Sequence, residues 1–199
     1  FRRVLFRSSS EVLRNCNEIR DKEDANVALE ASTTGHRVFS TIHAANCVKT
    51  IMRLLGLEVS RILLLSEIRM IISQRLVSVL CPYCSRPHTL TEREKSILTS
   101  DEISYLSGPN SRLRERGRPE DWKSCDHCSQ GVTDRMALAE YVIFDNTLRD
   151  ALLTEQGFTT VAKILSDHNF ASMWEKGLIL ASQGKVALDE IIRVIGKED

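Results

Sequence analysis

The chain has 199 residues, 42% of them hydrophobic, and its 27 basic residues balance 27 acidic ones to give a formal net charge of zero. This composition supports one or two domains with a buried core, and it excludes a disordered or polycationic chain and argues against non-specific nucleic-acid binding. The most apolar stretch, residues 62–80, is interrupted by charged residues such as Glu67 and Arg69, so it does not fit a membrane-spanning helix.

The first residues do not begin a regular element. Residues 1–8 (FRRVLFRS) are similar to a translated sequencing-library adapter and lack the polar cap of a helix start, so we exclude them from the fold prediction. Residues 9–17 show no clear hydrophobic period, and a regular pattern starts only at Ile19. We therefore expect the chain to be a fragment that begins inside a domain.

From residue 22 onward, helix and strand patterns alternate. Residues 22–32 are rich in alanine and acidic residues and stop before Gly35, which is typical of a helix end. The β-branched and aromatic run 37–43 predicts a buried strand, and Asn46 can cap the amphipathic helix that follows. This rhythm predicts an α/β core with a mostly parallel sheet.

A long apolar run comes next. We expect a helix from Ser60 to about Gln74, and a short segment, residues 76–80, that leads to a first pair of cysteines. Thr91-Glu-Arg-Glu94 matches a capping box and predicts a short helix. Residues 136–144 have strand character and would return the chain to the core. Four helices are expected after this strand, at 146–154, 159–167, 171–183 and 187–195.

Four of the six cysteines form two Cys-x-x-Cys pairs, Cys81/Cys84 and Cys125/Cys128. A two-residue spacer lets one tight turn present two sulfurs to the same ion, and tetrahedral zinc needs four ligands about 2.3 Å away. The spacing therefore predicts a closed, structural zinc site that clamps the two ends of the polar segment between the pairs.

Two alternatives to this ligand set remain. His88 and His127 could replace a cysteine, although a Cys-x-x-Cys pair is the stronger source of ligands. A disulfide pair is the alternative to a metal. The sequence starts with no signal-peptide pattern, and six reduced thiols suit a cytoplasmic compartment, so we favour the metal.

Polar side chains also gather near the ends of the first predicted elements. Glu18 and Arg20 precede the first helix, Thr34-Gly-His36 precedes the predicted strand, and Ser40-Thr-Ile-His43 ends it. Ligands of open α/β sheets bind at strand ends. A lone glutamate is usually a solvated residue and a histidine beside a strand is usually structural, so the combination carries the signal.

In this order the motifs resemble the secretion and type IV pilus assembly ATPases, the hexameric motors of type II secretion, pilus extension and competence systems. The resemblance covers residues 18–196, and the cysteine pairs favour the secretion and pilus-extension branch over the retraction branch. The matching segments are Glu18-Ile-Arg-Asp21 for the Walker B region, Thr34-Gly-His36 with Ser40-Thr-Ile-His43 for the histidine box, Gln74-Arg-Leu76 with the first cysteine pair, and the second pair with residues 131–140.

The resemblance implies a fold as well: a partial RecA-like (P-loop NTPase) α/β core with an inserted tetracysteine zinc module and a C-terminal helical subdomain. The core with Walker B and the histidine box would occupy residues 9–80. The zinc-binding insertion would occupy residues 81–135, and the return strand and helical subdomain residues 136–199.

It further implies an ATPase that binds ATP with Mg²⁺ between the subunits of a homo-hexameric ring. Glu18 would polarise the attacking water or hold the water shell of magnesium. His36 and His43 would lie near the nucleotide phosphates, and either could donate a hydrogen bond to the γ-phosphate. Arg20 and Arg75 would be further nucleotide contacts.

The implied partner is the inner-membrane platform protein of the secretion or pilus machine, with no specific nucleic acid. The protein would lie in the cytoplasm and would be held at the inner membrane by its partners. Two other functions stay open. One is a zinc-stapled interaction module, and the other is an inactive subunit of the same ring.

Two departures from the family pattern bear on activity. No Gly-x-x-x-x-Gly-Lys-Ser/Thr loop stands in the sequence, so we predict that this chain alone neither binds ATP tightly nor hydrolyses it. Asn17 replaces the glycine usual before the glutamate, and Arg14 and Asn15 fall where an aliphatic strand is expected. Either this strand is divergent, or bases were lost near the end of the read.

Overall fold

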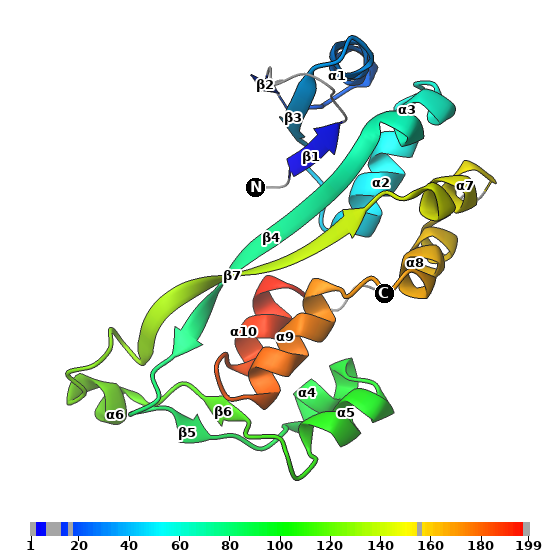
Figure 1. Cartoon of the computed structure of the whole chain (residues 1–199). Coiled ribbons are helices and arrows are strands. Elements are labelled where there is room, and N and C mark those ends of the chain that lie inside the picture. Colours follow the sequence, from blue (N-terminus) through cyan, green and yellow to red (C-terminus); the bar gives the residue numbers. More distant parts are fainter. Residues whose placement is uncertain (1–2, 7–12, 16–17, 155–156, 197–199) are drawn as a thin grey trace. The chain divides into compact units, whose positions relative to one another are not determined.

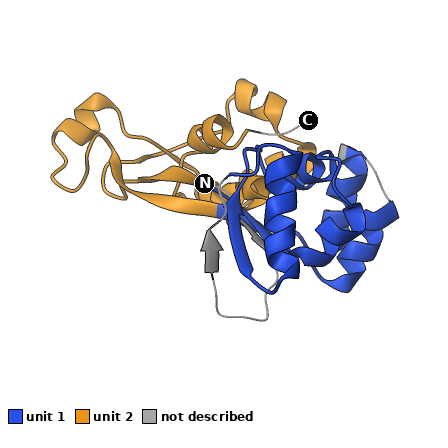
Figure 2. Ribbon diagram, turned by 90° about the horizontal axis from the view of Figure 1, so that it is seen from above, with its two compact units in different colours: residues 1–74, 139–171 blue, residues 75–138, 172–199 orange. Residues whose placement is uncertain are grey.

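The computed structural model describes residues 3–6, 13–15, 18–154 and 157–196, and it shows a mixed α/β chain (Figure 1). Contacts within the chain divide it into two compact units (Figure 2). The first consists of residues 1–74 and 139–171, and the second of residues 75–138 and 172–199.

A five-stranded sheet provides the framework of the first unit, and its last two strands continue into the second. Strand β2 runs parallel to β3, whereas β1 is antiparallel to both β3 and β4, so β3 and β4 point the same way. The sheet is therefore mixed, and the prediction of a mostly parallel sheet is wrong because β1 pairs between β3 and β4 in the opposite direction. The strands in spatial order are β2 (Leu13–Asn15), β3 (Arg37–Thr41), β1 (Arg3–Phe6), β4 (Ile68–Leu80) and β7 (Val132–Ile143).

Strand β1 falls in the adapter-like segment that we excluded from the fold prediction. Its backbone pairs with β3 from Arg3↔Thr41 to Phe6↔Val38, and also with β4. Backbone pairing describes how these residues fold and not where they come from. The adapter origin of residues 1–8 therefore stays a prediction.

The helices that precede and follow β3 in the chain form as the sequence predicts. Helix α1 (Lys22–Thr33) begins at Asp21, whose side chain accepts a hydrogen bond from the Asp24 amide. Helix α2 (Cys47–Leu55) begins at Asn46, whose Oδ1 accepts from the Lys49 amide at 2.8 Å. Each cap satisfies one of the amides that a helix N-terminus leaves unpaired. The buried faces of both helices join the main core.

The predicted helix from Ser60 to Gln74 is wrong beyond its first half. Helix α3 (Arg61–Glu67) ends at Glu67, and the chain continues directly as the 13-residue strand β4. Hydrophobic periodicity cannot separate a buried helix from a buried strand in a short apolar run. Pairing of β4 with its neighbours in the sheet decides in favour of the strand, and Ile68 and Ile71 are buried there.

Two of the four C-terminal helices complete the first unit. Helices α7 (Asn146–Thr154) and α8 (Phe158–Asp167) bury Leu148, Leu152 and other apolar residues in the main core. Arg149 on α7 donates hydrogen bonds to the backbone oxygens of Leu65 and Ile68, at 2.8 and 2.9 Å, where α3 ends. The arginine thus satisfies carbonyls that the helix leaves unpaired.

The other two helices, α9 (Met173–Ser182) and α10 (Leu188–Val194), belong to the second unit. They share an apolar core with the segment between the cysteine pairs, formed by Leu90, Leu98, Leu106, Leu113, Leu178, Ala181 and Leu188.

The segment between the cysteine pairs contains only short elements. They are the two-stranded sheet of β5 (Arg86–Pro87) and β6 (Arg114–Glu115), and the helices α4 (Glu92–Ile97), α5 (Ser100–Leu106) and α6 (Pro119–Lys123).

This arrangement differs from the domain boundaries expected from the sequence. The C-terminal helices divide between the two units instead of forming one subdomain, and the insertion does not bury its leucines by itself. The physical reason is that short amphipathic helices such as α4 and α5 need an apolar partner, which α9 and α10 supply. No helix of the described residues is long and apolar enough to cross a membrane.

Candidate functional site

Glu18 and His43 lie together at the ends of two parallel strands. Glu18 follows β2 and His43 follows β3. The Ile19 amide donates a hydrogen bond of 2.8 Å to the backbone oxygen of Thr41, which joins the two segments. The carboxylate Oε1 of Glu18 lies 2.7 Å from Nε2 of His43, and its Oε2 lies 3.2 Å from Nε of Arg20. The glutamate is the recessed member, since its side chain is 19% exposed against 83% for the histidine. The carboxyl ends of the strands therefore carry an acid with two nitrogen groups beside it.

Arg53, which no motif in the sequence marks, joins the two loops of this site. It lies in the last turn of α2, and its guanidinium donates to the backbone oxygens of His43 at 2.9 Å and Arg20 at 3.3 Å. A basic residue at the end of a helix ordinarily complements the helix dipole. Its position in the sequence thus gave no sign of the loops that it holds.

The structure does not bring His36 to Glu18. His36 precedes β3, at the strand end opposite to His43, and β3 spans about 16 Å. Its Nδ1 lies 3.1 Å from the Thr34 hydroxyl and 3.2 Å from the Ala31 oxygen, so the ring lies against the C-terminal end of α1. Of the two histidines in the predicted pair, only His43 contacts the acid.

The candidate arginines also differ in placement. Arg20 contacts Glu18 directly, and its own side chain is 74% exposed. Arg75 is an exposed residue on the part of β4 that belongs to the second unit, whereas Glu18 belongs to the first.

The four cysteines of the two pairs form one compact cluster. Their Sγ atoms all lie within 4.8 Å of one another, with 3.8 Å between Cys81 and Cys125 and 3.5 Å between Cys84 and Cys128. Four sulfurs at 2.3 Å from a tetrahedral zinc ion would be about 3.8 Å apart. The donor set and its spacing therefore fit a metal ion held by four thiolates.

Backbone hydrogen bonds shape the first of the two turns. The Cys81 amide bonds the Gly131 oxygen, and the Ser85 amide bonds back to the Cys81 oxygen, each at 3.0 Å. Burial alone would raise the pKa of the Cys81 thiol, but hydrogen bonds from the Cys84 and Tyr83 amides and from neighbouring thiols lower it to about 7. Metal ligands must be thiolates, so the surroundings of Cys81 favour the form that binds, whereas burial and the neighbouring thiols raise the pKa of Cys84.

The alternatives to a four-cysteine metal site find no support in the structure. All four residues are free thiols. The His127 ring stacks on the Tyr83 ring with centroids 4.2 Å apart, and both lie on the outside of the cysteine turns. His88 contacts two carboxylates instead.

Gly117 is required where β6 leads toward the cluster. A Cβ at this position would lie 2.1 Å from the backbone oxygen of Cys84, a contact that real structures do not show. We expect Gly117→Ala to displace the first cysteine turn and to lower the free energy of unfolding by about 1–3 kcal/mol. The check is loss of bound metal to a chelator together with the urea midpoint. Gly56→Ala is the matched control, because its Cβ would meet backbone oxygens only at 3.4 and 3.5 Å.

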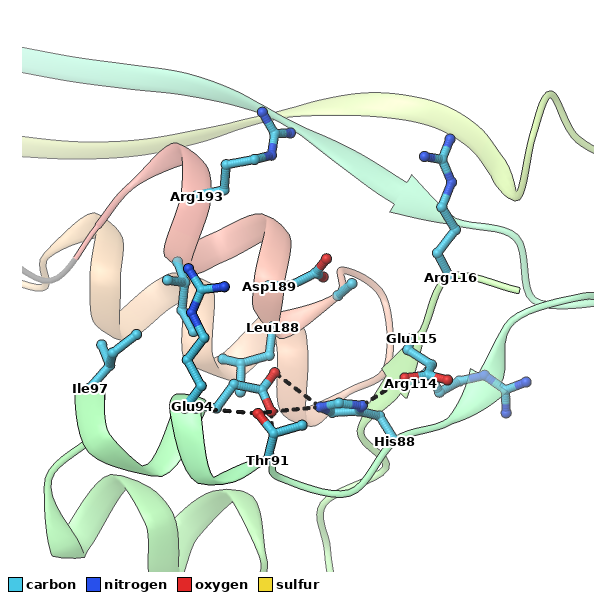
Figure 3. Close-up of a pocket in the computed structure, with 13 residues that line it drawn as sticks. His88, Thr91, Glu94, Ile97, Arg114, Glu115, Arg116, Leu188, Asp189 and Arg193 are labelled. Carbon is cyan, nitrogen blue, oxygen red and sulfur yellow. Dashed lines mark hydrogen bonds and ion pairs between the residues drawn. The ribbon is translucent and has the colours of Figure 1, made fainter. Parts of the chain in front are cut away.

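A cavity of about 700 Å³ opens beside α4 and α10 in the second unit (Figure 3). His88 lies on its wall between two acids, with Nδ1 2.9 Å from Glu115 Oε2 and Nε2 2.9 Å from Glu94 Oε2. Because carboxylates only accept hydrogen bonds, both ring nitrogens must carry protons. The capping box predicted at Thr91 and Glu94 is present, so Glu94 serves both the helix and the histidine.

This arrangement makes the stability of the second unit depend on pH. Burial lowers the pKa of His88, but Glu94 and Glu115 outweigh it and raise the pKa above the ordinary value. Burial raises the pKa of Glu94, but the Thr91 amide and His88 outweigh it and lower the pKa. Because the pKa of His88 is raised, its contribution to stability is fully present below about pH 6.5 and is lost as the pH rises through the folded pKa. Because the pKa of Glu94 is lowered, its contribution to stability is fully present above about pH 4.3 and is lost as the pH falls through the folded pKa.

We therefore expect the urea midpoint of the second unit to be highest between the lowered pKa of Glu94 and the raised pKa of His88. The urea midpoint should fall as the pH rises above the pKa of His88. His88→Gln should flatten the alkaline side of the profile. A wild-type profile with no decline on that side would contradict the ion pair.

Comparison with known proteins identifies the family. The family model described as "Type II/IV secretion system protein" matches residues 16–193. The chain belongs to this family. The resemblance inferred from the Walker B, histidine and cysteine motifs is therefore confirmed at the level of the type II/IV secretion family.

Curated members of the family align with nearly all of the chain. It is 30% identical to the type II secretion system protein E of Aeromonas hydrophila over 192 residues, which are 96% of this chain and 36% of that protein. It is 30% identical to the type IV pilus assembly ATPase PilB of Pseudomonas aeruginosa, covering 96% of this chain and 32% of PilB. The chain thus spans about a third of the length of these relatives.

Solved structures of the same kind share the fold. The pilus retraction motor PilT with bound ADP matches with a TM-score of 0.57 at 20% identity, covering 94% of this chain and 40% of PilT. The ATPase DotB of Legionella pneumophila matches with a TM-score of 0.56 at 22% identity, covering 90% of this chain and 37% of DotB. The chain therefore shares the mixed α/β fold of PilT and DotB.

Proposed function

We propose that this chain is part of a hexameric ATPase that powers type II secretion or type IV pilus assembly, and that it supplies the Walker B acid, Glu18, and its partner His43. The observation that carries the proposal is the 2.7 Å contact between these side chains at the carboxyl ends of adjacent parallel strands. Ligands of open α/β sheets bind at this edge.

The chemistry of the pair suits phosphoryl transfer. The transition state spreads negative charge over the γ-phosphate oxygens, so catalysis depends on positioned donors and on an oriented water. Glu18 would orient that water or the water shell of Mg²⁺. His43 and Arg20 lie beside it and would face the phosphates of ATP. The sheet would be the C-terminal part of a RecA-like core.

The four cysteines would hold a structural zinc ion. Four thiolates, from Cys81, Cys84, Cys125 and Cys128, would fill the tetrahedral shell of zinc, so no position would be open for catalysis. The ion would fix both ends of the segment between the cysteine pairs.

We further propose a homo-hexameric ring in the cytoplasm that docks on the inner-membrane platform protein of its machine, without specific nucleic-acid binding. The support is the family itself, because curated relatives are named as type II secretion and type IV pilus assembly proteins.

A chimera tests the proposal. Residues 16–193 replace the aligned segment of the Aeromonas hydrophila relative, so that the rest of the ATPase comes from that protein. We expect the purified chimera to hydrolyse ATP at a rate above that of the relative with the segment deleted. A folded, assembled chimera without turnover would refute an active motor.

The second candidate is a non-catalytic subunit or a zinc-stapled interaction module. It is favoured by Arg14 and Asn15 in β2, where a Walker B strand should be aliphatic. For this candidate the chimera would fold, retain zinc and stay inactive.

A further inference from the structure

Glu140 is a buried carboxyl group in the first unit, and in the sequence it is the last residue of the segment 131–140 that follows the second cysteine pair. It lies near the C-terminal end of β7 and is 2% exposed. Glutamate is almost never fully buried unless it is paired, because desolvation of a carboxylate is costly. Its position therefore needs a partner that repays the burial.

That partner is the start of helix α2. Glu140 Oε1 accepts a hydrogen bond of 2.6 Å from the Cys47 amide, 93 residues away in the sequence. Cys47 is the first residue of α2, where amides have no partner within the helix and the helix dipole favours a negative charge. The fully buried Cys47 sulfur lies 3.7 Å from the backbone oxygen of Glu140 and 3.8 Å from the backbone oxygen of Ile71. Strands β7 and β4 thus hold the start of α2.

The start of α2 controls the loop that carries His43. Only three residues separate His43 from Cys47, and the last of them, Asn46, is the cap of α2. At the other end of the same helix, Arg53 binds the His43 oxygen. A shift of α2 therefore moves both attachments of this loop and changes the distance between His43 and Glu18.

We propose that Glu140 is a positioning residue for the Glu18–His43 pair, acting through the N-terminus of α2. The role for catalysis rests on the proposed function, whereas the mechanical link does not. Removing the carboxyl group leaves the Cys47 amide without this acceptor, loosens the first turn of α2 and lets His43 withdraw from Glu18.

The test uses the chain as it stands and needs no turnover. The imidazole signals of His43 are followed by NMR in Glu140→Ala and Glu140→Gln, with Glu18→Ala as the reference for a broken pair. We expect Glu140→Ala to move the His43 signals toward their positions in Glu18→Ala. Glu140→Gln, whose amide oxygen can still accept from Cys47, should restore much of the wild-type position.

Cys47 supplies a second readout at the start of α2. We expect its alkylation, mapped by mass spectrometry, to rise about tenfold in Glu140→Ala, because local opening exposes a buried thiol. Glu94→Gln is the control, since it removes another buried carboxylate from the second unit and should change neither readout.

Unchanged His43 signals alongside raised Cys47 alkylation would overturn the proposal and leave Glu140 as a helix anchor only. If Glu140→Ala does not fold, Glu140→Asp replaces it, because the shorter side chain withdraws from Cys47 while keeping a carboxyl group. His43 must then move in the same direction, or the proposal fails. An inactive chimera with the expected NMR shifts would refute the ATPase function and leave this link standing.

Discussion

Replacing Cys84 by serine is expected to release the metal from the cysteine cluster, from about one ion per chain to about a tenth or less. Cys84 is buried, and its sulfur lies 3.5 Å from that of Cys128, so it is part of the cluster. A serine hydroxyl is a harder ligand than a thiolate and does not replace it. Structural zinc supplies about 10 kcal/mol or more of folding free energy to small sites. Metal analysis and hydrogen exchange of residues 85–124 measure the loss.

The packing of the second unit predicts which residues lose hydrogen-exchange protection when the metal is released. The leucines of α4 and α5 pack on α9 and α10, so protection should fall most around the two cysteine turns and less in these helices. The first unit should keep its fold, because its core contains none of the four cysteines. Cys47→Ser is the matched control: it changes another buried cysteine, outside the cluster, and should retain the metal. Full metal content in Cys84→Ser would mean that the ligand set is wrong.

Replacing Glu18 by glutamine in the chimera is expected to lower kcat for ATP hydrolysis about a hundredfold or more, as is usual when a positioned acid or base is lost. Glutamine keeps the size of the side chain but replaces one carboxylate oxygen by an amide group, so it neither contacts His43 nor orients water in the same way. The affinity for ATP should change much less than kcat, because the group acts mainly in the transition state.

Glu23→Gln is the control for this effect. Glu23 is an exposed acid in the first turn of α1, and it lies on the same unit as Glu18. Its replacement should leave kcat within about twofold, since surface changes of this kind cost little. Equal losses in both variants would show that Glu18 acts through stability and not through chemistry.

Local signals in the sequence predicted several elements correctly. Asn46 marks the start of α2, and Thr91 with Glu94 marks the start of α4. The two Cys-x-x-Cys pairs predicted one cluster, which the sulfur distances confirm. These features succeed because they depend on residues within one turn of each other.

Signals that depend on distant partners failed. The apolar pattern from Ser60 to Gln74 predicts one helix, but it fits a strand equally well, and only the pairing of β4 in the sheet decides. The sequence also predicts one C-terminal helical subdomain, whereas α7 and α8 pack in one unit and α9 and α10 in the other.

The sequence by itself determined the family and the cysteine cluster, and it singled out Glu18 as a candidate acid, because each of these signals is a short motif with its own chemistry. Only the tertiary structure decided which groups meet that acid. His43 contacts Glu18 while His36 lies at the other end of β3, and Arg53 and Glu140 hold the loop from separate elements. Parallel strands bring their carboxyl ends to one edge of the sheet, and contacts across 93 residues leave no local trace in the sequence.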